Sequence, residues 1–262
     1  MKIQTMRLVT VFLFSIVVVP GFAQSQRTHR DSIKFALGGD TMITQKLSVF
    51  TEPAYLEMID VIRDADFAFI NFEAQIPNGK GYPKAKPHNA TGGVYMDAPP
   101  FVADELVWAG IDGVSLAHNH SADFGLGGQI ETHRILKEAG LSVAGFGMNL
   151  ADAQFPVYRE TAKGRVAVVA TASTFEAYIR AGEQGGAGRG RPGISTLRFE
   201  REWIIEEKAL NSFKELAASQ GLPYIETESG ALFFGNQLSV GPSPQERTWP
   251  LEEDLEGIVQ SI

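Results

Sequence analysis

The chain has 262 residues, of which 44% are hydrophobic and 21% are charged, so it folds as one globular domain or at most two. It contains no cysteine, which excludes disulfide bonds, a cysteine nucleophile and a thiolate metal site. The formal net charge of −8 argues against a nucleic-acid partner, because an acidic surface repels the phosphate backbone.

Residues 1–23 have the pattern of a secretory signal peptide. Lys2 and Arg7 precede an apolar segment over residues 8–20, and Ala23 supplies a small residue for cleavage. The apolar segment is shorter than the roughly 20 residues that span a membrane, which disfavours an anchor. We expect a secreted or periplasmic protein, cleaved near Ala23, with 21 Lys and Arg against 31 Asp and Glu and a net charge of about −10.

The first predicted strand covers residues 33–37 and stops at Gly38-Gly39-Asp40. Glycines there allow a sharp turn and place the Asp40 carboxylate at the strand end. A helix is predicted from Pro53, because the apolar residues that follow recur at helical spacing.

The second predicted strand covers residues 67–70 and also ends in polar groups, Asn71 and Glu73. Residues 74–98, broken by prolines and glycines, are predicted to form a long irregular loop. Its basic side chains form a local patch that either attracts an anionic substrate or is merely solvated: Lys80, Lys84, Lys86 and His88.

A helix is predicted over residues 99–109, and the short apolar run at 114–117 reads as a buried third strand. The loop that follows carries two imidazoles, an amide and a carboxylate: His118, Asn119, His120 and Asp123. In an open α/β sheet, ligands bind beyond the carboxyl ends of the strands. A functional loop is therefore the better interpretation of this cluster than four structural side chains.

A helix over residues 128–139 and a strand over 142–144 follow, with His133 interpreted as a packing or surface residue and Asn149 as a helix cap. The order so far is βαβαβαβ. That order predicts a mainly parallel sheet with helices on its faces.

The pattern changes after residue 156. Residues 157–160 and 165–172 are predicted to form an antiparallel pair of strands. A glycine-rich loop over 173–193 then either holds an anion or acts as a mobile lid. Its arginines are Arg180, Arg189 and Arg191, and the absence of a Gly-Lys-Ser/Thr ending excludes a P-loop.

The last predicted elements are a strand over 194–199, a helix over 200–220, a strand or hairpin over 231–240 around Gly235-Asn236, and a helix over 251–262. That last helix has no glycine stop and no cationic final turn. We therefore interpret it as interrupted midway.

Several of these segments together resemble the CapA-type capsule-synthesis proteins, which are associated with poly-γ-glutamate capsule formation. The resemblance extends over about residues 33–200 and rests on Gly38–Met42, Asn71–Glu73 and Ala117–Gly125, with Glu138–Gly140, Gly145–Asn149 and Gly190–Gly193. It implies an α/β fold of four αββα layers, similar to the calcineurin-like metallophosphoesterases. It also implies one such domain over residues 33–262.

By that resemblance, Asp40, Asn71, Glu73 and Asn119 match the positions of metal ligands. His120 matches an acid or phosphate-contacting group, and His118 is its candidate catalytic partner, standing where the family commonly has Asn. Oxygen and imidazole ligands from three strand ends suit Mn, Fe, Zn or Mg, and a bound metal acidifies a water.

One departure concerns the carboxyl end. Family members usually add histidine motifs of the His-Gly-Glu type there, whereas this chain has no histidine after His133. We therefore expect a CapA-type domain that is truncated at its carboxyl end.

Three functions remain open from the sequence. The protein is an exported metal-dependent hydrolase of a phosphoester or a polymer amide bond, a non-catalytic accessory that guides an anionic capsule polymer, or a domain whose polar loops are structural. The missing carboxyl-terminal histidines favour the accessory role, in capsule-polymer biosynthesis or processing at the cell envelope, or an inactive truncated fragment of a hydrolase. The purely structural interpretation is the least favoured. The expected partners are an anionic capsule polymer or a small anionic substrate, together with other capsule-assembly proteins.

Overall fold

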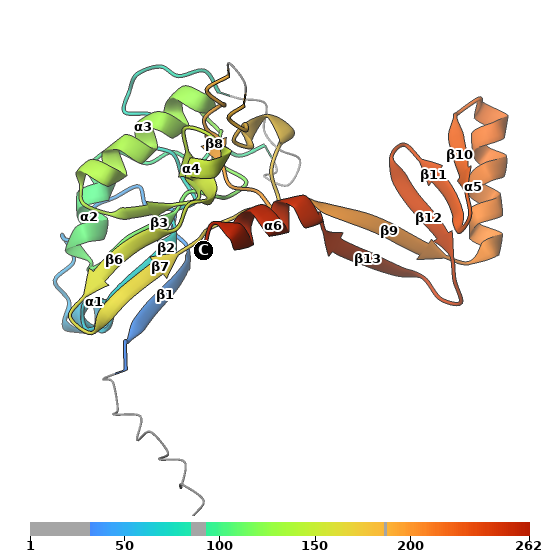
Figure 1. The fold of residues 1–262 in the computed structure, drawn as a ribbon. Helices are drawn as coiled ribbons and strands as arrows, with labels where there is room; N and C mark the ends of the chain where they lie inside the picture. Colours follow the sequence, from blue (N-terminus) through green and yellow to red (C-terminus); the bar gives the residue numbers. More distant parts are fainter. Residues whose placement is uncertain (1–31, 85–92, 186–187) are drawn as a thin grey trace, which may run out of the picture. The chain divides into compact units, whose positions relative to one another are not determined.

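The computed structural model describes residues 32–84, 93–185 and 188–262, and residues 33–262 belong to one structural unit whose helices and strands are labelled in Figure 1. The predicted signal peptide lies outside the described residues. No helix in the described ranges is long and apolar enough to cross a membrane.

A four-stranded parallel sheet organises the first half of this unit. Its strands lie in sequence order, and they are β1 (Phe35–Asp40), β2 (Phe67–Asn71), β3 (Gly113–Ser115) and β4 (Ser142–Ala144). The connecting helices are α1 (Pro53–Arg63), α2 (Val102–Trp108) and α3 (Gly125–Glu138). The predicted βαβαβαβ order and its parallel sheet are confirmed (Figure 1).

The principal core lies between this sheet and the connecting helices. Val114 of β3, Leu106 of α2 and Leu136 of α3 are almost completely buried in it. A parallel strand that is covered by a crossover helix must be apolar, which explains the short hydrophobic runs that predicted β2 and β3.

The register of the sheet sets its strand ends level with one another. Asp40 pairs with Asn71, Asn71 pairs with Ser115, and Ser115 pairs with Ala144. Because all four strands run the same way, the segments that follow these residues emerge at one edge.

The prediction that β1 stops at residue 37 was wrong. The strand continues to Asp40 through a register shift between Leu37 and Asp40. A Cβ atom on Gly38 would lie only 2.8 Å from the Ile70 side chain, so this glycine permits close approach of the neighbouring strand rather than a turn.

Smaller elements follow the parallel sheet. Strand β5 (Phe146–Gly147) pairs with β8 (Gly193–Ile194), and β6 (Val157–Thr161) pairs with β7 (Gly164–Val168). The antiparallel pair is confirmed, although β7 ends four residues earlier than predicted. Between them lie α4 (Leu150–Gln154) and the short 3-10 helix η2 (Ala177–Ile179).

Two single-residue predictions can be checked in this region. The Asn149 side chain accepts a hydrogen bond from the backbone N–H of Asp152 at 2.9 Å, so it caps α4 as predicted. The ring of His133 packs on Phe146 with 4.9 Å between ring centroids, which confirms a packing role.

A five-stranded sheet covers most of the remaining chain, in the order β10-β11-β12-β9-β13. The strands are β9 (Phe199–Ile205), β10 (Tyr224–Thr227), β11 (Gly230–Phe233), β12 (Asn236–Val240) and β13 (Gln245–Pro250). Helix α5 (Glu207–Gln220) packs on one face through Leu210 and Ala217. The predicted hairpin is confirmed, with Phe234 and Gly235 at positive φ in its turn.

Three predictions in this segment were wrong. Residues 200–205 are strand rather than helix, because β12 and β13 satisfy the backbone of β9 on both of its edges. The strand predicted over 194–199 is divided between the end of β8 and the start of β9. Strands β10 and β13 were missed, since their residues alternate too weakly to be distinguished from loops.

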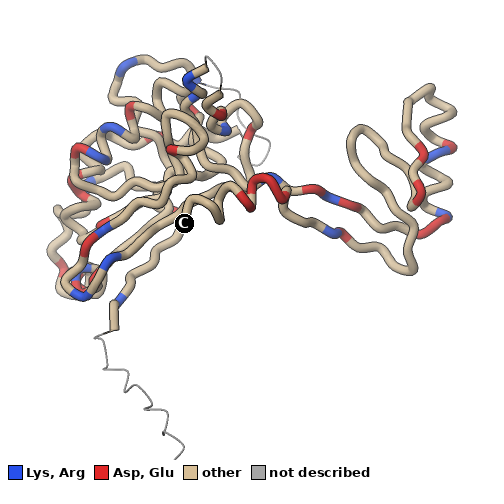
Figure 2. Tube along the Cα trace, in the orientation of Figure 1, with Lys and Arg blue, Asp and Glu red and all other residues tan. Residues whose placement is uncertain are grey.

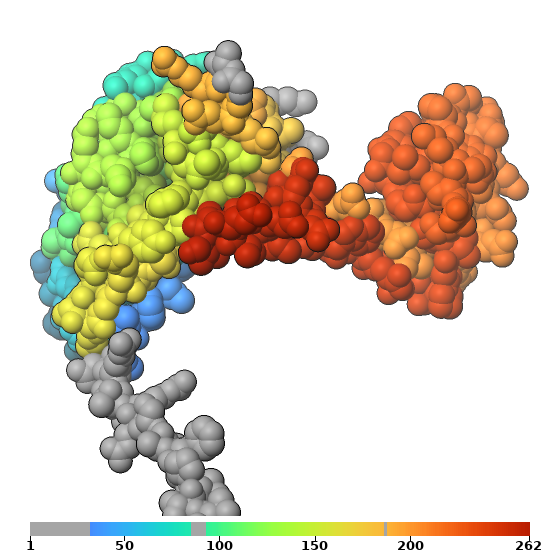
Figure 3. Space-filling view, in the orientation of Figure 1, coloured from blue at the N-terminus to red at the C-terminus, as the bar shows by residue number. Residues whose placement is uncertain are grey.

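The predicted final helix is confirmed as α6 (Glu252–Gln260), whose acidic first turn is visible in Figure 2. Asp254 in that turn is only 2% exposed and accepts hydrogen bonds from the Arg198 backbone at 2.8 Å and from its guanidinium at 2.7 and 2.9 Å. Arg180 reaches the same carboxylate at 3.2 Å. At the other end of α6, the Ser261 hydroxyl donates to the carbonyl of Gln154, the last residue of α4. Figure 3 draws the C-terminal segment that contains α6 in red.

The Asp254→Ala substitution should therefore destabilise the fold. Breaking a fully buried ion pair costs roughly 3–5 kcal/mol, and we expect about 2–3 kcal/mol here because Arg198 is partly exposed. Burial opposes ionisation of Asp254, but the hydrogen bonds from Arg198 hold its pKa below the ordinary value. The loss should thus shrink as the pH falls below about 4, because Asp254 takes up a proton in the unfolded chain before it does so in the folded protein.

Urea denaturation at pH 7 and pH 3 measures both effects. The matched control is Glu253→Ala, since Glu253 also contacts Arg198 but its side chain is 66% exposed. The control should change the free energy of unfolding by less than about 0.5 kcal/mol. Equal effects of the two substitutions would contradict the stabilising role of the buried Asp254–Arg198 ion pair.

Candidate functional site

The level strand ends bring polar side chains from three separate segments together. Asp40 ends β1, Asn71 ends β2, and Glu73 follows two residues later. The Asn71 side-chain amide donates to the Asp40 carboxylate at 2.9 Å, which fixes the orientation of both groups. The loop after β3 supplies the rest of the cluster.

Residues 116–124 form that loop, and Ser121 and Gln75 hold its shape. The Ser121 hydroxyl accepts a hydrogen bond from the His118 backbone at 3.0 Å and lies 2.7 Å from the Leu116 carbonyl oxygen. The Gln75 amide donates to the Ser121 carbonyl, and its oxygen accepts from the Phe124 backbone at 2.6 Å. Gln75 is 1% exposed, so both ends of its amide are used inside the protein.

Sequence reasoning missed Gln75 as a positioning residue. It follows β2 by only a few positions, but glutamine is usually exposed, and its partners lie 46 and 49 residues further along the chain. No local pattern in the sequence carries that information.

His120 is oriented by a carboxylate behind it. Its Nδ1 lies 2.8 Å from Asp123 Oδ2, and the same oxygen accepts a hydrogen bond from the Met96 backbone at 2.6 Å. The other ring nitrogen, Nε2, lies 4.0 Å from Glu73 Oε1. Asp123 thus fixes the ring so that Nε2 faces the acidic side of the cluster. The sequence placed Asp123 in this loop but gave it no such role.

Glu73 and Asp40 form a coupled acidic pair. Burial raises the pKa of Glu73 to about 7, helped by its hydrogen bond to Asp40 and by the negative charge of Asp40, while His120 and Asn119 act in the opposite direction. Hydrogen bonds from Asn71 and Glu73 lower the pKa of Asp40. Between the lowered pKa of Asp40 and the raised pKa of Glu73, the pair therefore holds one proton, mainly on Glu73.

His118 lies beside this pair, and neither of its ring nitrogens hydrogen-bonds to a described residue, although the Phe72 backbone is near. Burial, helped by the neighbouring His120, lowers the pKa of His118 to about 3. The ring is accordingly neutral at physiological pH. Two unsatisfied ring nitrogens in a buried position are unusual and need a partner.

The structure brings all six predicted site residues into one cluster: Asp40, Asn71, Glu73, His118, Asn119 and His120. Within the described parts of the chain, no group of three or more His, Asp or Glu side chains is placed to hold a metal ion. The cluster also contains two amides, Asn71 and Asn119, besides the two carboxylates. The assignment of a metal to them stays a prediction.

Three basic side chains of the two loops are engaged by other residues, whereas Arg189 and Arg191 are exposed. Lys80 pairs with Glu131 at 2.8 Å, and Lys84 lies 4.6 Å over the ring of Tyr95. Arg180 is held by Asp254, as described above. Lys86 and His88 lie outside the described residues.

Comparison with known proteins gives the family. Residues 34–220 match the family model described as bacterial capsule synthesis protein PGA_cap. The chain belongs to the PGA_cap family. This match confirms the resemblance to CapA-type proteins and includes every residue of the cluster.

Three relatives of this PGA_cap protein are informative. Two uncharacterized proteins of Sinorhizobium fredii (strain NBRC 101917 / NGR234), y4sH and y4uA, are each 33% identical over 186 residues, which is 71% of this chain and 40% of the relative. The capsule biosynthesis protein CapA of Bacillus anthracis is 26% identical over 158 residues, 57% of this chain and 37% of CapA. The chain thus spans about two fifths of the length of these relatives.

The acidic pair makes the stability of this PGA_cap protein depend on pH in a defined direction. Between the ordinary glutamate pKa of about 4.5 and the folded value of about 7, the folded state binds more protons than the unfolded state. The free energy of unfolding should therefore fall as the pH rises through this range. Glu73→Gln keeps a donor for Asp40 but cannot ionise, so it should make this dependence shallower and be most favourable above pH 7.

Urea denaturation at pH 5, 6, 7 and 8 measures the slope for both proteins. Glu57→Gln on the exposed side of α1 is the matched control and should leave the slope unchanged. If the Glu73 variant and the parent protein show parallel pH profiles, the shared proton is the wrong description.

Proposed function

We propose that this PGA_cap protein acts in the synthesis or processing of an anionic capsule polymer, and that its strand-end cluster binds a divalent cation. The observation that carries the proposal is the hydrogen-bonded pair of carboxylates, Asp40 and Glu73, facing two amides and an oriented imidazole. The family name and the name of the Bacillus anthracis relative support the capsule-related role.

The donor set fits a cation. Carboxylate and amide oxygens are the ligands that Mg²⁺ and Mn²⁺ prefer, and nearby imidazole extends the range to Zn²⁺ and Fe. Asp40, Asn71, Glu73 and Asn119 would hold the ion. Without it, burial raises the pKa of Glu73 to about 7, and the hydrogen bond to Asp40 and its negative charge act in the same direction. A bound cation would supply positive charge and Lewis acidity.

The imidazole supports a catalytic role. Asp123 fixes the His120 ring, and Nε2 on its far side would hold or donate a proton to an anionic group of the substrate. This geometry favours a second candidate function, metal-dependent hydrolysis of a phosphoester or of a polymer amide bond. His118, being neutral and buried, would act through Asp40 or the ion rather than as a proton donor.

The charge of the cluster limits how a polymer could bind. Two carboxylates at the strand ends repel an anionic chain, so a polyglutamate carboxylate would approach them through the cation. The polymer, a smaller anionic substrate and other capsule-assembly proteins are the partners that we propose. We also propose export to the cell envelope, and a four-layer αββα arrangement in which the parallel sheet and α1–α3 supply two layers.

Metal binding can be measured without an assay for activity. At pH 8, where Glu73 is ionised, Mn²⁺ or Mg²⁺ at 100 times the dissociation constant would stabilise the protein by about 2.7 kcal/mol. For a domain of this size that corresponds to an increase in Tm of roughly 5–10 °C. Asp40→Ala and Asn119→Ala should each abolish most of the increase.

The control is Asp104→Asn, which removes an exposed carboxylate from α2 and should leave the metal-induced increase intact. The same increase in all four proteins would exclude metal binding at the cluster. Hydrolysis is tested separately with a phosphodiester and with poly-γ-glutamate, and turnover that survives His120→Ala would remove the catalytic role of His120.

A further inference from the structure

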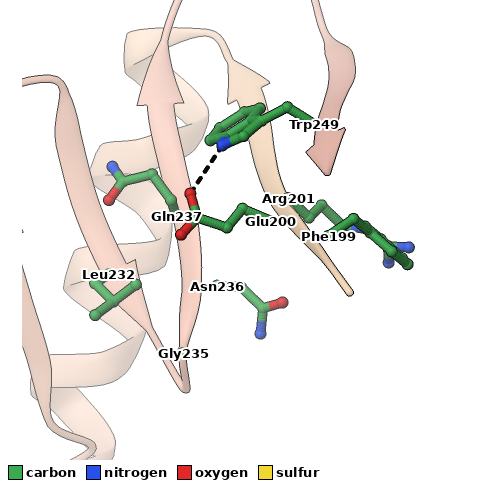
Figure 4. A pocket seen from close by; sticks show the side chains of 8 residues that line it. All are labelled: Phe199, Glu200, Arg201, Leu232, Gly235, Asn236, Gln237 and Trp249. Atoms are coloured by element: carbon green, nitrogen blue, oxygen red, sulfur yellow. Dashed lines mark hydrogen bonds between the residues drawn. The ribbon is translucent and has the colours of Figure 1, made fainter. Parts of the chain in front are cut away.

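The five-stranded sheet carries a cavity that contains no residue of the strand-end cluster. The cavity has a volume of about 670 Å³ (Figure 4) and is lined by Phe199, Glu200, Arg201, Leu232, Gly235, Asn236, Gln237 and Trp249. Small-molecule sites commonly occupy about 300–1,000 Å³. Strand pairing and alternation put Trp249, Glu200, Gln237 and Leu232 on the face of the sheet away from α5, whereas Phe199, Arg201 and Asn236 line the cavity from the α5 side.

Trp249 is the aromatic centre of this cavity. It stands directly opposite Glu200 across strands β13 and β9, and its indole N–H donates to the Glu200 carboxylate at 2.8 Å. The hydrogen bond fixes the ring, which is still 43% exposed. Trp249 therefore presents a rigid apolar surface with a polar edge.

Amide groups from the β11–β12 hairpin line the opposite side. The Asn236 amide nitrogen lies 3.2 Å from the Phe234 carbonyl oxygen, and the Gln237 amide nitrogen donates to the Thr227 hydroxyl at 2.9 Å. Because these contacts use the nitrogen ends, the amide oxygens are left to accept from a ligand. The Glu200 carboxylate, which has two oxygens, also keeps acceptor positions beyond the one used by Trp249.

Charge argues against an anionic ligand here. Among the described residues that line the cavity, Arg201 is the one cation, and it is paired with Glu246 at 2.8 Å and lies over the Phe199 ring. Residues 199–250 carry eight Asp and Glu against four Lys and Arg, distributed along the strands and α5 as in Figure 2. A ligand rich in hydroxyl groups and without negative charge suits this lining.

We propose that this cavity binds a neutral saccharide chain. One sugar ring would stack its C–H face on Trp249, while Glu200 and Gln237, on the same face of the sheet, accept hydrogen bonds from its hydroxyls. Two adjoining cavities of about 370 and 400 Å³ share Phe199 and Arg201 with it, so the surface extends beyond a single ring. The proposal does not depend on the function of the strand-end cluster.

Isothermal titration with the signal-peptide-free chain tests the proposal. The probes are the hexasaccharides of glucose, in α- and β-linked forms, and of N-acetylglucosamine. At least one should bind, and Trp249→Ala should weaken that binding at least tenfold. Trp249→Phe, which keeps an aromatic face, should retain most of the affinity even if the alanine variant is less stable.

The matched control is Trp108→Ala. Trp108 is the last residue of α2 and lines none of these three cavities. It should leave binding unchanged. The proposal is overturned if none of the probes binds at millimolar concentration, if both tryptophan variants have equal effects, or if poly-γ-glutamate displaces the sugar in a salt-dependent manner. Binding that survives Asp40→Ala confirms that the two sites are independent.

Discussion

The level register of the three strands β1, β2 and β3 is the constraint on which the candidate site depends. Asp40, Asn71 and Ser115 occupy one line across the sheet, so the side chains that follow them meet although 31 residues separate Asp40 from Asn71. The register shift between Leu37 and Asp40 is part of this arrangement. Without it, a residue other than Asp40 would pair with Asn71 at the end of β1. A one-residue slip turns side chains to the opposite face, so the site tolerates little change in register.

Buried polar contacts then hold the loops that the strands deliver. Gln75 connects the backbone at Ser121 and Phe124, and Asp123 connects His120 to the Met96 backbone. Leaving one of these polar side chains unpaired inside the protein would cost more free energy than its hydrogen bond contributes to stability. The loop is consequently specified as one conformation, which is what a site built from a short loop requires.

The sequence predicted the half of the fold in which local pattern and burial agree. Apolar runs at 67–70 and 114–117 found β2 and β3, and polar residues after them found the cluster. It failed at 200–205, where pairing with β12 and β13 decides the structure and the residues themselves are compatible with a helix. Gln75 was missed for a related reason, since its role exists only through residues distant in sequence.

The acidic pair of Asp40 and Glu73 and the cavity at Trp249 also differ in the charge of the ligand that they favour. At the strand ends, a cation held as we propose would have to displace the proton shared by Asp40 and Glu73, so its affinity should rise with pH. On the five-stranded sheet, Glu200 is already engaged by Trp249, and the nearby arginine is neutralised by Glu246. Binding of a neutral ligand there has no proton to displace and no ion pair to break, so its affinity should depend little on pH or salt.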